Sequence, residues 1–340
     1  MKCVFAEEQM AHAPKSFLVN GVITSTPEKP ERADILKNAL EKHGHSITRP
    51  GDYGLDAIRA VHDDRYISYL ERAHERWSRI PGASEEIIPN IHPLNRNNGY
   101  PKSVAAQAGY HSTDTSAPIS KDTWHSILWS AWTAIEASEM ILNGEKHAYA
   151  LCRPPGHHAS KDTVGGFCYF NNTAIATQNL LKKYSKIAIL DVDLHHGNGT
   201  QEIFYDRDDV LTLSVHADPE RFYPFFWGYT DEIGTGAGEG YNINYPLPLG
   251  SGDDPFMECV EDAMKKIKNF GAEVVVIALG LDAYEGDPFA GLAVTTEGYN
   301  QMAKIIASYT DTPILMVQEG GYICDELGDN LVSFLRGIED

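Results

Sequence analysis

The stretch KIAILDVDLHHGNGT, residues 186–200, decides the fold class. Its first half is an unbroken apolar run, which is typical of a strand buried on both faces of a parallel sheet. Its second half places Asp191, Asp193 and His195 at every second position, so all three side chains can point to one side beyond the strand's carboxyl end. Ligand sites of open α/β sheets lie at that edge. The stretch therefore predicts a parallel sheet with a site at the carboxyl ends of its strands.

Similar apolar runs recur along the chain and alternate with amphipathic segments. The runs are YALC (149–152), VLTLSVH (210–216), VVVIALGLD (274–282) and ILMVQEGG (314–321). A spacing of 3.6 residues predicts helices over 30–44, 123–144, 171–184, 254–271 and 295–309, with Gly271 as a C-cap. We predict one α/β domain over residues 1–340, with a central parallel sheet flanked by helices on both faces, because no linker-like boundary divides the chain.

Residues 81–122 are rich in Pro, Asn, Gly, Ser and Thr and have no steady period. A connection of this length is unusual inside a compact domain, and insertions of this kind are usually functional loops or interfaces. A surface excursion without function is the alternative. We expect a long insertion loop here.

The composition excludes several classes of function. A net charge of −20, from 28 Lys and Arg against 48 Asp and Glu, disfavours nucleic acid and anionic membranes as partners and favours cationic ligands, although many proteins are acidic for solubility alone. Five scattered cysteines without a C-x-x-C pair indicate neither a disulfide framework nor a thiolate zinc site. The first 25 residues contain no signal-like apolar run. We expect a cytoplasmic protein that binds neither nucleic acid nor membrane.

Two strand ends bring together groups that suit a metal ion. Asp282 follows the run VVVIALGL, and its carboxylate could complete a zinc site with Asp193 and His195. A catalytic zinc needs three such protein ligands and one position left open. A strand-end Asp more often caps the next turn or helix, so the D-x-D-x-H-H spacing carries the prediction.

Two further motifs offer proton donors and acceptors. RPPGHH places His157 and His158 in tandem after a strand, where they can serve as acid and base. EGGY places Tyr322 after two glycines, in a turn that could bring the phenol over a substrate oxygen. Taken alone the tyrosine is a weak signal, since most such residues are packing residues.

Five separated segments, RPPGHHA, GGFCYFNN, DVDLHHGNGTQ, LGLDAY and EGGY, resemble in order and spacing the histone deacetylase and acetylpolyamine amidohydrolase family. The resemblance covers most of the chain and implies an arginase/deacetylase-like fold. It implies one Zn²⁺ per chain on Asp193, His195 and Asp282, with Fe²⁺ as the other ion that this ligand set accepts. Catalysis would fall to His157, His158 and Tyr322.

The resemblance also implies supporting residues. Asp191 would hydrogen-bond His157, and Asn198 would be the partner of His158. Because a neutral amide stabilises imidazolium less than a carboxylate does, we expect His158 to have the lower pKa and to act as base. A structural K⁺ would use Asp191, Asp193, His195, Ser214 and Val215. Phe167 and Phe225 would line the channel that grips the aliphatic stem of the substrate.

The N-terminal segment, the 81–122 loop and FYPFFWG resemble the bacterial acetylpolyamine amidohydrolases, in which a dimer partner's loop narrows the channel. The expected reaction is therefore hydrolysis of small cationic acetylated amines, such as acetylputrescine, acetylcadaverine and acetylspermidine, by a homodimer that pairs through residues 81–122. Glu85, Glu86 and Asp114 are candidate carboxylates for the substrate ammonium.

Three alternatives stay open. A deacetylase of acetyl-lysine in proteins or peptides would share every catalytic residue and would differ in its wider channel mouth. A binuclear manganese ureohydrolase would need a further bridging carboxylate where this chain has Asn198. A protein that binds polyamines without turnover would be expected to have lost a metal ligand or Tyr322, and all of these residues are present.

Overall fold

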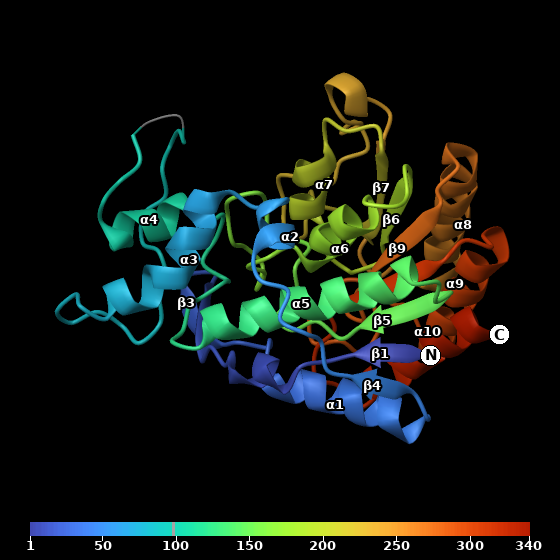
Figure 1. The fold of residues 1–340 in the computed structure, drawn as a ribbon, viewed down its shortest axis with the longest axis horizontal. Coiled ribbons are helices and arrows are strands. Elements are labelled where there is room, and N and C mark those ends of the chain that lie inside the picture. Colours follow the sequence, from blue (N-terminus) through green and yellow to red (C-terminus); the bar gives the residue numbers. More distant parts are fainter. Residues whose placement is uncertain (97–98) are drawn as a thin grey trace.

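The computed structural model describes residues 1–96 and 99–340. Its centre is an eight-stranded sheet in the order β4-β1-β5-β10-β9-β6-β7-β8, with all neighbouring strands parallel (Figure 1). The strands are β1 (Lys2–Val4), β4 (Ser46–Thr48), β5 (His147–Ala150), β6 (Ile187–Asp191), β7 (Val210–Ala217), β8 (Asn242–Leu247), β9 (Val274–Leu279) and β10 (Ile314–Gln318). The predicted parallel sheet is confirmed, and the five predicted strands are consecutive neighbours within it.

Alternate side chains of each strand enter two separate cores. In β9, Val274 and Val276 pack on one face of the sheet, whereas Val275 and Ile277 pack on the other. A strand buried in this way is apolar at every position, which explains why the sequence shows unbroken runs and no alternation. The first core includes side chains from α3, α5 and α6, and the second includes side chains from α1, α8, α9 and α10. The prediction of helices on both faces is confirmed.

The five predicted helices are present. They are α1 (Pro30–Lys42), α5 (Thr123–Leu142), α6 (Asn172–Leu180), α8 (Asp253–Phe270) and α9 (Thr296–Tyr309). Gly271 ends α8 with a φ of 76°, the left-handed conformation of a C-cap. The helices that were not predicted are α2 (Asp56–Arg59), α3 (Asp64–Trp77), α4 (Val104–Tyr110), α7 (Asn198–Phe204) and α10 (Leu327–Glu339), with two 3₁₀ helices, η1 (Glu7–Ala11) and η2 (Gly236–Gly238).

Two segments lie outside the central layers. An antiparallel hairpin of β2 (Ser16–Val19) and β3 (Val22–Ser25), not predicted, exposes Val22 and Ile23. The predicted loop 81–122 contains α4, which lies with α3 at the left of Figure 1, and a bridge joins Ile87 to Ile119, both buried. Residues 97–98 of this loop lie outside the described residues.

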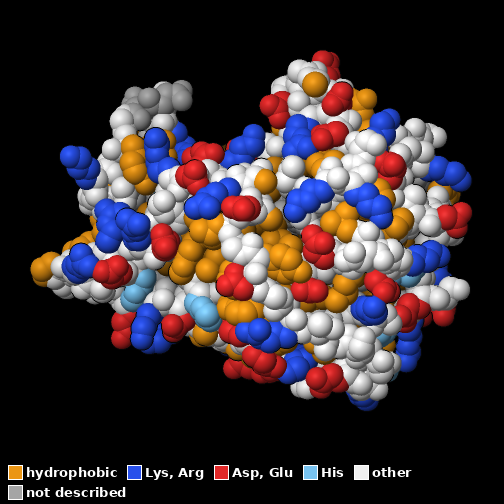
Figure 2. Space-filling view, viewed as in Figure 1, with side chains coloured by type: hydrophobic (Ala, Val, Ile, Leu, Met, Phe, Trp, Pro, Cys, Tyr) orange, Lys and Arg blue, Asp and Glu red, His pale blue; other side chains and the backbone are white. Residues whose placement is uncertain are grey.

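The surface carries charges of both signs. Figure 2 shows Lys, Arg, Asp and Glu side chains spread over one face, with apolar groups gathered near its centre. Over residues 1–96 and 99–340, no helix combines the length and the apolar character needed to cross a bilayer. All five cysteines are free thiols.

Candidate active site

Four neighbouring strands deliver the candidate residues to one edge of the sheet. The order β5-β10-β9-β6 places the segments that follow these strands side by side. The turn with His157 and His158 follows β5, Tyr322 follows β10, Asp282 follows β9, and Asp193 with His195 follows β6. Since all four strands are parallel, their carboxyl ends meet at this edge.

Asp193, His195 and Asp282 form a compact set of donors. His195 Nδ1 lies 3.2 Å from Asp193 Oδ1 and 3.2 Å from Asp282 Oδ2, and all three side chains are buried. Ligand bonds of about 2.0–2.2 Å in a tetrahedral arrangement separate neighbouring donor atoms by roughly 3.3–3.5 Å, so these donors fit a single small divalent metal ion. Two buried carboxylates on one imidazole also need a cation for charge balance. Asp193, His195 and Asp282 therefore fit one divalent metal ion such as zinc in both spacing and charge.

Main-chain N–H groups orient the two carboxylates. Gly320 N donates to Asp193 Oδ2 at 2.8 Å, and Leu194 N donates to Asp282 Oδ1 at 3.0 Å. One oxygen of each carboxylate, Asp193 Oδ2 or Asp282 Oδ1, thus accepts a main-chain hydrogen bond, and the other oxygen faces His195. Such partners of the ligands fix ligand orientation and tune the bound metal.

The tandem histidines have different partners and opposite pKa shifts. His157 Nδ1 lies 3.0 Å from Asp191 Oδ2, and His158 Nδ1 lies 2.7 Å from Asn198 Oδ1. Burial alone lowers the pKa of His157, but the charges of Asp193 and Asp191 outweigh it and raise that pKa to about 10. Burial and the positive charge of His157 lower the pKa of His158 well below its usual value. The pair therefore combines a cationic ring with a neutral one.

Glu319, the first residue of EGGY, is a buried carboxylate that was not predicted as a site residue. Its Oε2 accepts hydrogen bonds from the N–H groups of Gly156 (2.6 Å) and His157 (2.9 Å). Burial raises its pKa to about 7. Its ligand atoms also lie near those of His157 and Cys168, but burial raises the pKa of the Cys168 thiol well above its usual value and disfavours the thiolate that a metal requires.

Tyr322 is fixed on several sides. Its N–H donates to Asp287 Oδ2 at 2.9 Å, and its ring lies edge-on to Phe289, with 4.7 Å between ring centroids, and to Phe167 at 5.9 Å. Burial raises the pKa of the phenol well above its usual value, so Tyr322 is a neutral hydrogen-bond donor. Asp287 and Phe289 lie beyond Asp282 in a turn that no sequence pattern marked.

A pocket of about 330 Å³ opens above these residues. Its lining includes the two predicted channel residues, Phe167 and Phe225, and Phe17, Phe222, Tyr223 and Phe289, which were not predicted. Phe167 and Phe225 have φ values of 67° and 65°, a region that is costly for a bulky residue and that concentrates at functional sites. The channel is therefore aromatic, and its two predicted walls are held in strained backbone conformations.

The predicted acidic residues do not line this pocket. Glu85 is exposed and pairs with Lys15 at 2.6 Å, and Glu86 accepts a hydrogen bond from Lys15 N at 2.6 Å. The Asp114 carboxylate is bound by Tyr223 Oη at 2.6 Å and by two main-chain N–H groups. The charged residue at the rim is instead a cation, Arg221, which is exposed.

The residues expected at a monovalent cation site lie on β6 and its neighbour β7. Asp191 and Ser214 are register partners in the parallel pair, and both line a small internal cavity beside Gly197. Asp193 and His195 follow Asp191 but turn their side chains toward Asp282, and Val215 is buried in β7. The structure thus brings Asp191 and Ser214 together.

Known proteins are similar to this chain in both sequence and fold. The histone deacetylase domain matches residues 26–338. An acetylpolyamine amidohydrolase of Burkholderia pseudomallei is 42% identical over 99% of this chain and 98% of its own length, and acetylpolyamine amidohydrolase 1 of Pseudomonas aeruginosa is 42% identical over 100% and 99%. A crystal structure of the acetylpolyamine aminohydrolase from Burkholderia pseudomallei superposes with a TM-score of 0.95, at 42% identity over 99% of this chain and 98% of that chain. The chain belongs to the histone deacetylase family.

Proposed function

We propose that this chain is a zinc-dependent amidohydrolase that deacetylates acetylated polyamines and releases acetate and the free amine. The observation that carries the proposal is the juxtaposition of a three-donor metal set with a charged and a neutral histidine and a neutral tyrosine at the base of one aromatic pocket. Each of these groups meets one requirement of amide hydrolysis.

Asp193, His195 and Asp282 would hold the metal. A divalent metal ion at this place would lower the pKa of an attacking water and polarise the amide carbonyl. Zinc suits two carboxylates and one imidazole, and Fe²⁺ suits them as well. We propose zinc as the resident ion.

The histidines would move and stabilise charge. His158 Nδ1 faces Asn198, so Nε2 is the atom left for substrate. This nitrogen takes a proton from water as the new C–O bond forms, and it returns a proton to the amine nitrogen as the C–N bond breaks. His157 keeps its proton because the Asp191 carboxylate, 3.0 Å from its Nδ1, favours the charged ring, and its positive charge stabilises the negative charge that develops on the substrate.

Tyr322 would donate a hydrogen bond to the former carbonyl oxygen. Its high pKa keeps the proton on the phenol at neutral pH. Removal of one such donor costs about a hundredfold or more in kcat, or about 3 kcal/mol. We therefore assign Tyr322 as the oxyanion donor.

The aromatic channel supports a slender amine as substrate. Phe167 and Phe225 would pack against a methylene stem, and the ring faces near the rim would attract an ammonium group through cation–π interaction. The names of the Burkholderia and Pseudomonas relatives point to the same substrate class. Because the described lining outside the catalytic centre has no carboxylate, these π faces stand in for the acidic residues expected from the sequence.

Three further parts of the proposal concern a second bound ion, dimerisation and cellular location. A structural K⁺ would bind Asp191 and Ser214 with main-chain oxygens of neighbouring residues, including Asp193, His195 and Val215. Two copies would pair through residues 81–122. The cytoplasm suits a protein with five free thiols, because disulfides are rare in that compartment.

The test compares kcat/KM for acetylputrescine and for an acetyl-lysine peptide on the same zinc-loaded protein. We expect the polyamine to be favoured by about tenfold or more, a chelator to abolish both activities, and added Zn²⁺ to restore them. Tyr322→Phe should lower kcat by about a hundredfold while one metal per chain is retained.

Preference for the peptide would move the assignment to a protein or peptide deacetylase with the same chemistry. Two metal ions per chain would instead favour a ureohydrolase. Tight binding of acetylputrescine without product would contradict the proposed hydrolysis and favour a polyamine-binding protein.

A further inference from the structure

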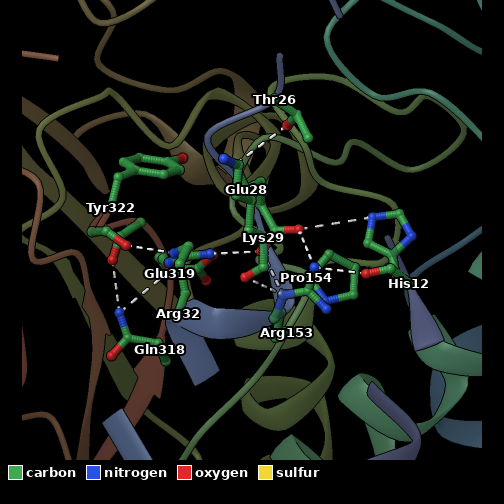
Figure 3. A network of polar contacts seen from close by, with 12 residues as sticks. His12, Thr26, Glu28, Lys29, Arg32, Arg153, Pro154, Gln318, Glu319 and Tyr322 are labelled. Carbon is green, nitrogen blue, oxygen red and sulfur yellow. Dashed lines mark hydrogen bonds and ion pairs between the residues drawn. The ribbon is translucent and has the colours of Figure 1, made fainter. Parts of the chain in front are cut away.

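A buried carboxylate holds two buried guanidinium groups beside the active site. Glu28 Oε1 lies 2.8 Å from Arg32 Nη1 and 2.9 Å from Arg153 Nε, and Glu28 Oε2 accepts from Arg153 Nη2 at 2.9 Å (Figure 3). Glu28 is 0% exposed, Arg32 2% and Arg153 1%. Charged groups are rarely buried to this extent unless they are paired. The three side chains form a closed cluster that the proposed chemistry does not use.

Arg32 binds the turn that carries Tyr322. Its Nε donates to Gly321 O at 2.5 Å and its Nη2 donates to Glu319 O at 2.9 Å (Figure 3). Its guanidinium carbon lies 4.8 Å from the centroid of the Tyr322 ring. Arg32 therefore fixes the main chain on the N-terminal side of Tyr322 and places a positive charge against its ring.

Arg153 begins the turn that carries the two histidines. Its guanidinium donates to the carbonyl oxygens of Gln9 (2.8 Å), His12 (2.6 Å) and Lys29 (3.1 Å), which fixes it to the N-terminal segment. His157 follows four residues later, and Gly156 N and His157 N are held in turn by Glu319. The cluster thus connects two catalytic turns that approach the site from different strands.

The charges within the cluster make Glu28 its centre. Two guanidinium groups face one carboxylate, and the nearby His12 adds no third charge, because burial lowers its pKa to about 3. Arg153 and Arg32 offset the effect of burial on Glu28 and lower its pKa below the usual value. Without the carboxylate, the two guanidinium groups would repel each other in a medium of low dielectric.

We propose that Glu28 is a positioning residue for the deacetylation reaction: by holding Arg32 and Arg153 together, it sets Tyr322 in register with His157 and His158. The inference rests on the proposed function. Glu28 acts through Arg32 and Tyr322 and touches no substrate.

A double-mutant cycle tests this role, because residues that act through one another give non-additive effects. The rates of acetylputrescine hydrolysis are measured for wild type, Glu28→Gln, Tyr322→Phe and the double variant, with metal content and KM. We expect Glu28→Gln to lower kcat by about tenfold or more with KM and metal content nearly unchanged. In the Tyr322→Phe background the same substitution should lower kcat by less than about threefold, because the hydroxyl that Glu28 positions is already absent.

Asp253→Asn provides a matched control. Asp253 is a half-buried carboxylate at the start of α8 that accepts hydrogen bonds from Thr295 N and Thr295 Oγ1. Its substitution should leave kcat unchanged. If Glu28→Gln does not fold, the cycle is run with Glu28→Asp, which keeps the charge but is one methylene too short to serve both guanidinium groups.

An equal loss of kcat in both backgrounds, or wild-type kcat in Glu28→Gln, would overturn the role of Glu28 and leave the proposed function intact. Absence of turnover by the wild-type protein on acetylated amines would overturn both.

Discussion

Arg221 lines the pocket rim beside Phe222 and Tyr223, and its guanidinium has no ion-pair partner among the described residues. A cation at this place repels the distal ammonium of a polyamine. At a separation of ~8 Å in water the repulsion is about 0.5 kcal/mol, and it doubles if the local dielectric constant is halved. Arg221 therefore opposes the substrate class that the aromatic channel favours, and it should limit the rate with short diamines.

We expect Arg221→Gln to raise kcat/KM for acetylputrescine about twofold to fivefold, and the gain should shrink in high salt because the charges are exposed to solvent. The uncharged N-acetylpentylamine serves as control and should be hydrolysed equally well by both proteins. An equal change for the neutral substrate would mean that Arg221 acts through the packing of its aliphatic stem and not through its charge.

Individual site residues were predictable where a local pattern marked them. Asp193 and His195 lie at period two beyond an apolar run, and Asp282 ends another run, so the sequence alone predicted them as a set. Glu28 and Arg32 carry no such mark, because Arg32 reaches Gly321 across 289 positions of the chain. The candidate acidic residues lie outside the pocket lining for a similar reason: Tyr223 and main-chain N–H groups occupy the Asp114 carboxylate, and their proximity follows only from the fold.

At the level of secondary structure, the end of β10 must pass very close to the proposed metal ligands Asp193 and Asp282. A Cβ atom added at Gly320 would lie 2.3 Å from Asp282 Oδ2 and 2.6 Å from Asp193 Oδ2, closer than any real contact of this kind. The N–H of the same residue holds Asp193 in place. Glycine is therefore needed where the chain passes between the carboxylates that follow two neighbouring strands.

Gly320→Ala should weaken metal affinity by about tenfold to a hundredfold and lower kcat with it, because both ligand carboxylates must shift. Isothermal titration of the metal-free protein with Zn²⁺ measures the change. Gly51→Ala is the matched control, since its added Cβ would meet only Tyr53 Cε2, at 3.9 Å. A Gly320→Ala protein that binds zinc as tightly as wild type would show that the carboxylates are not the ligands.

The strands that the sequence predicted are the buried ones at the centre of the sheet. Strands β5, β6, β7, β9 and β10 are buried at almost every position because they are covered on both faces, and β9 is apolar throughout. Strands β1 and β4 have three residues each, which is too short for a period to show, and the sheet edge formed by β4 is partly exposed. The insertion of β10 between β5 and β9 could not be predicted, because strand order depends on crossover connections and not on local composition.

For the whole molecule, the excess of negative charge bears on assembly. Two copies with a net charge of −20 each repel one another, so a stable dimer needs an apolar contact of compensating strength. The 81–122 loop offers two such side chains, Leu94 and Ile91, which are 104% and 63% exposed. Large apolar groups exposed in this way often mark an interface. The hairpin residue Ile23, 74% exposed, is a second candidate.

We expect Leu94→Glu to weaken the proposed dimer by about tenfold to a hundredfold in Kd, because it places a further negative charge in a contact between two acidic chains. Light scattering after gel filtration, over a range of protein concentrations, measures the mass of both proteins. Leu249→Glu, at a residue 46% exposed outside the loop, is the control and should keep the wild-type mass.

If the partner's loop also narrows the channel, the monomeric variant should hydrolyse acetyl-lysine peptides faster relative to acetylputrescine. If Leu94→Glu stays dimeric while Ile23→Glu becomes monomeric, the interface lies at the β2–β3 hairpin. A wild-type protein that is monomeric at micromolar concentration would contradict the dimer and, with it, this explanation of substrate selectivity.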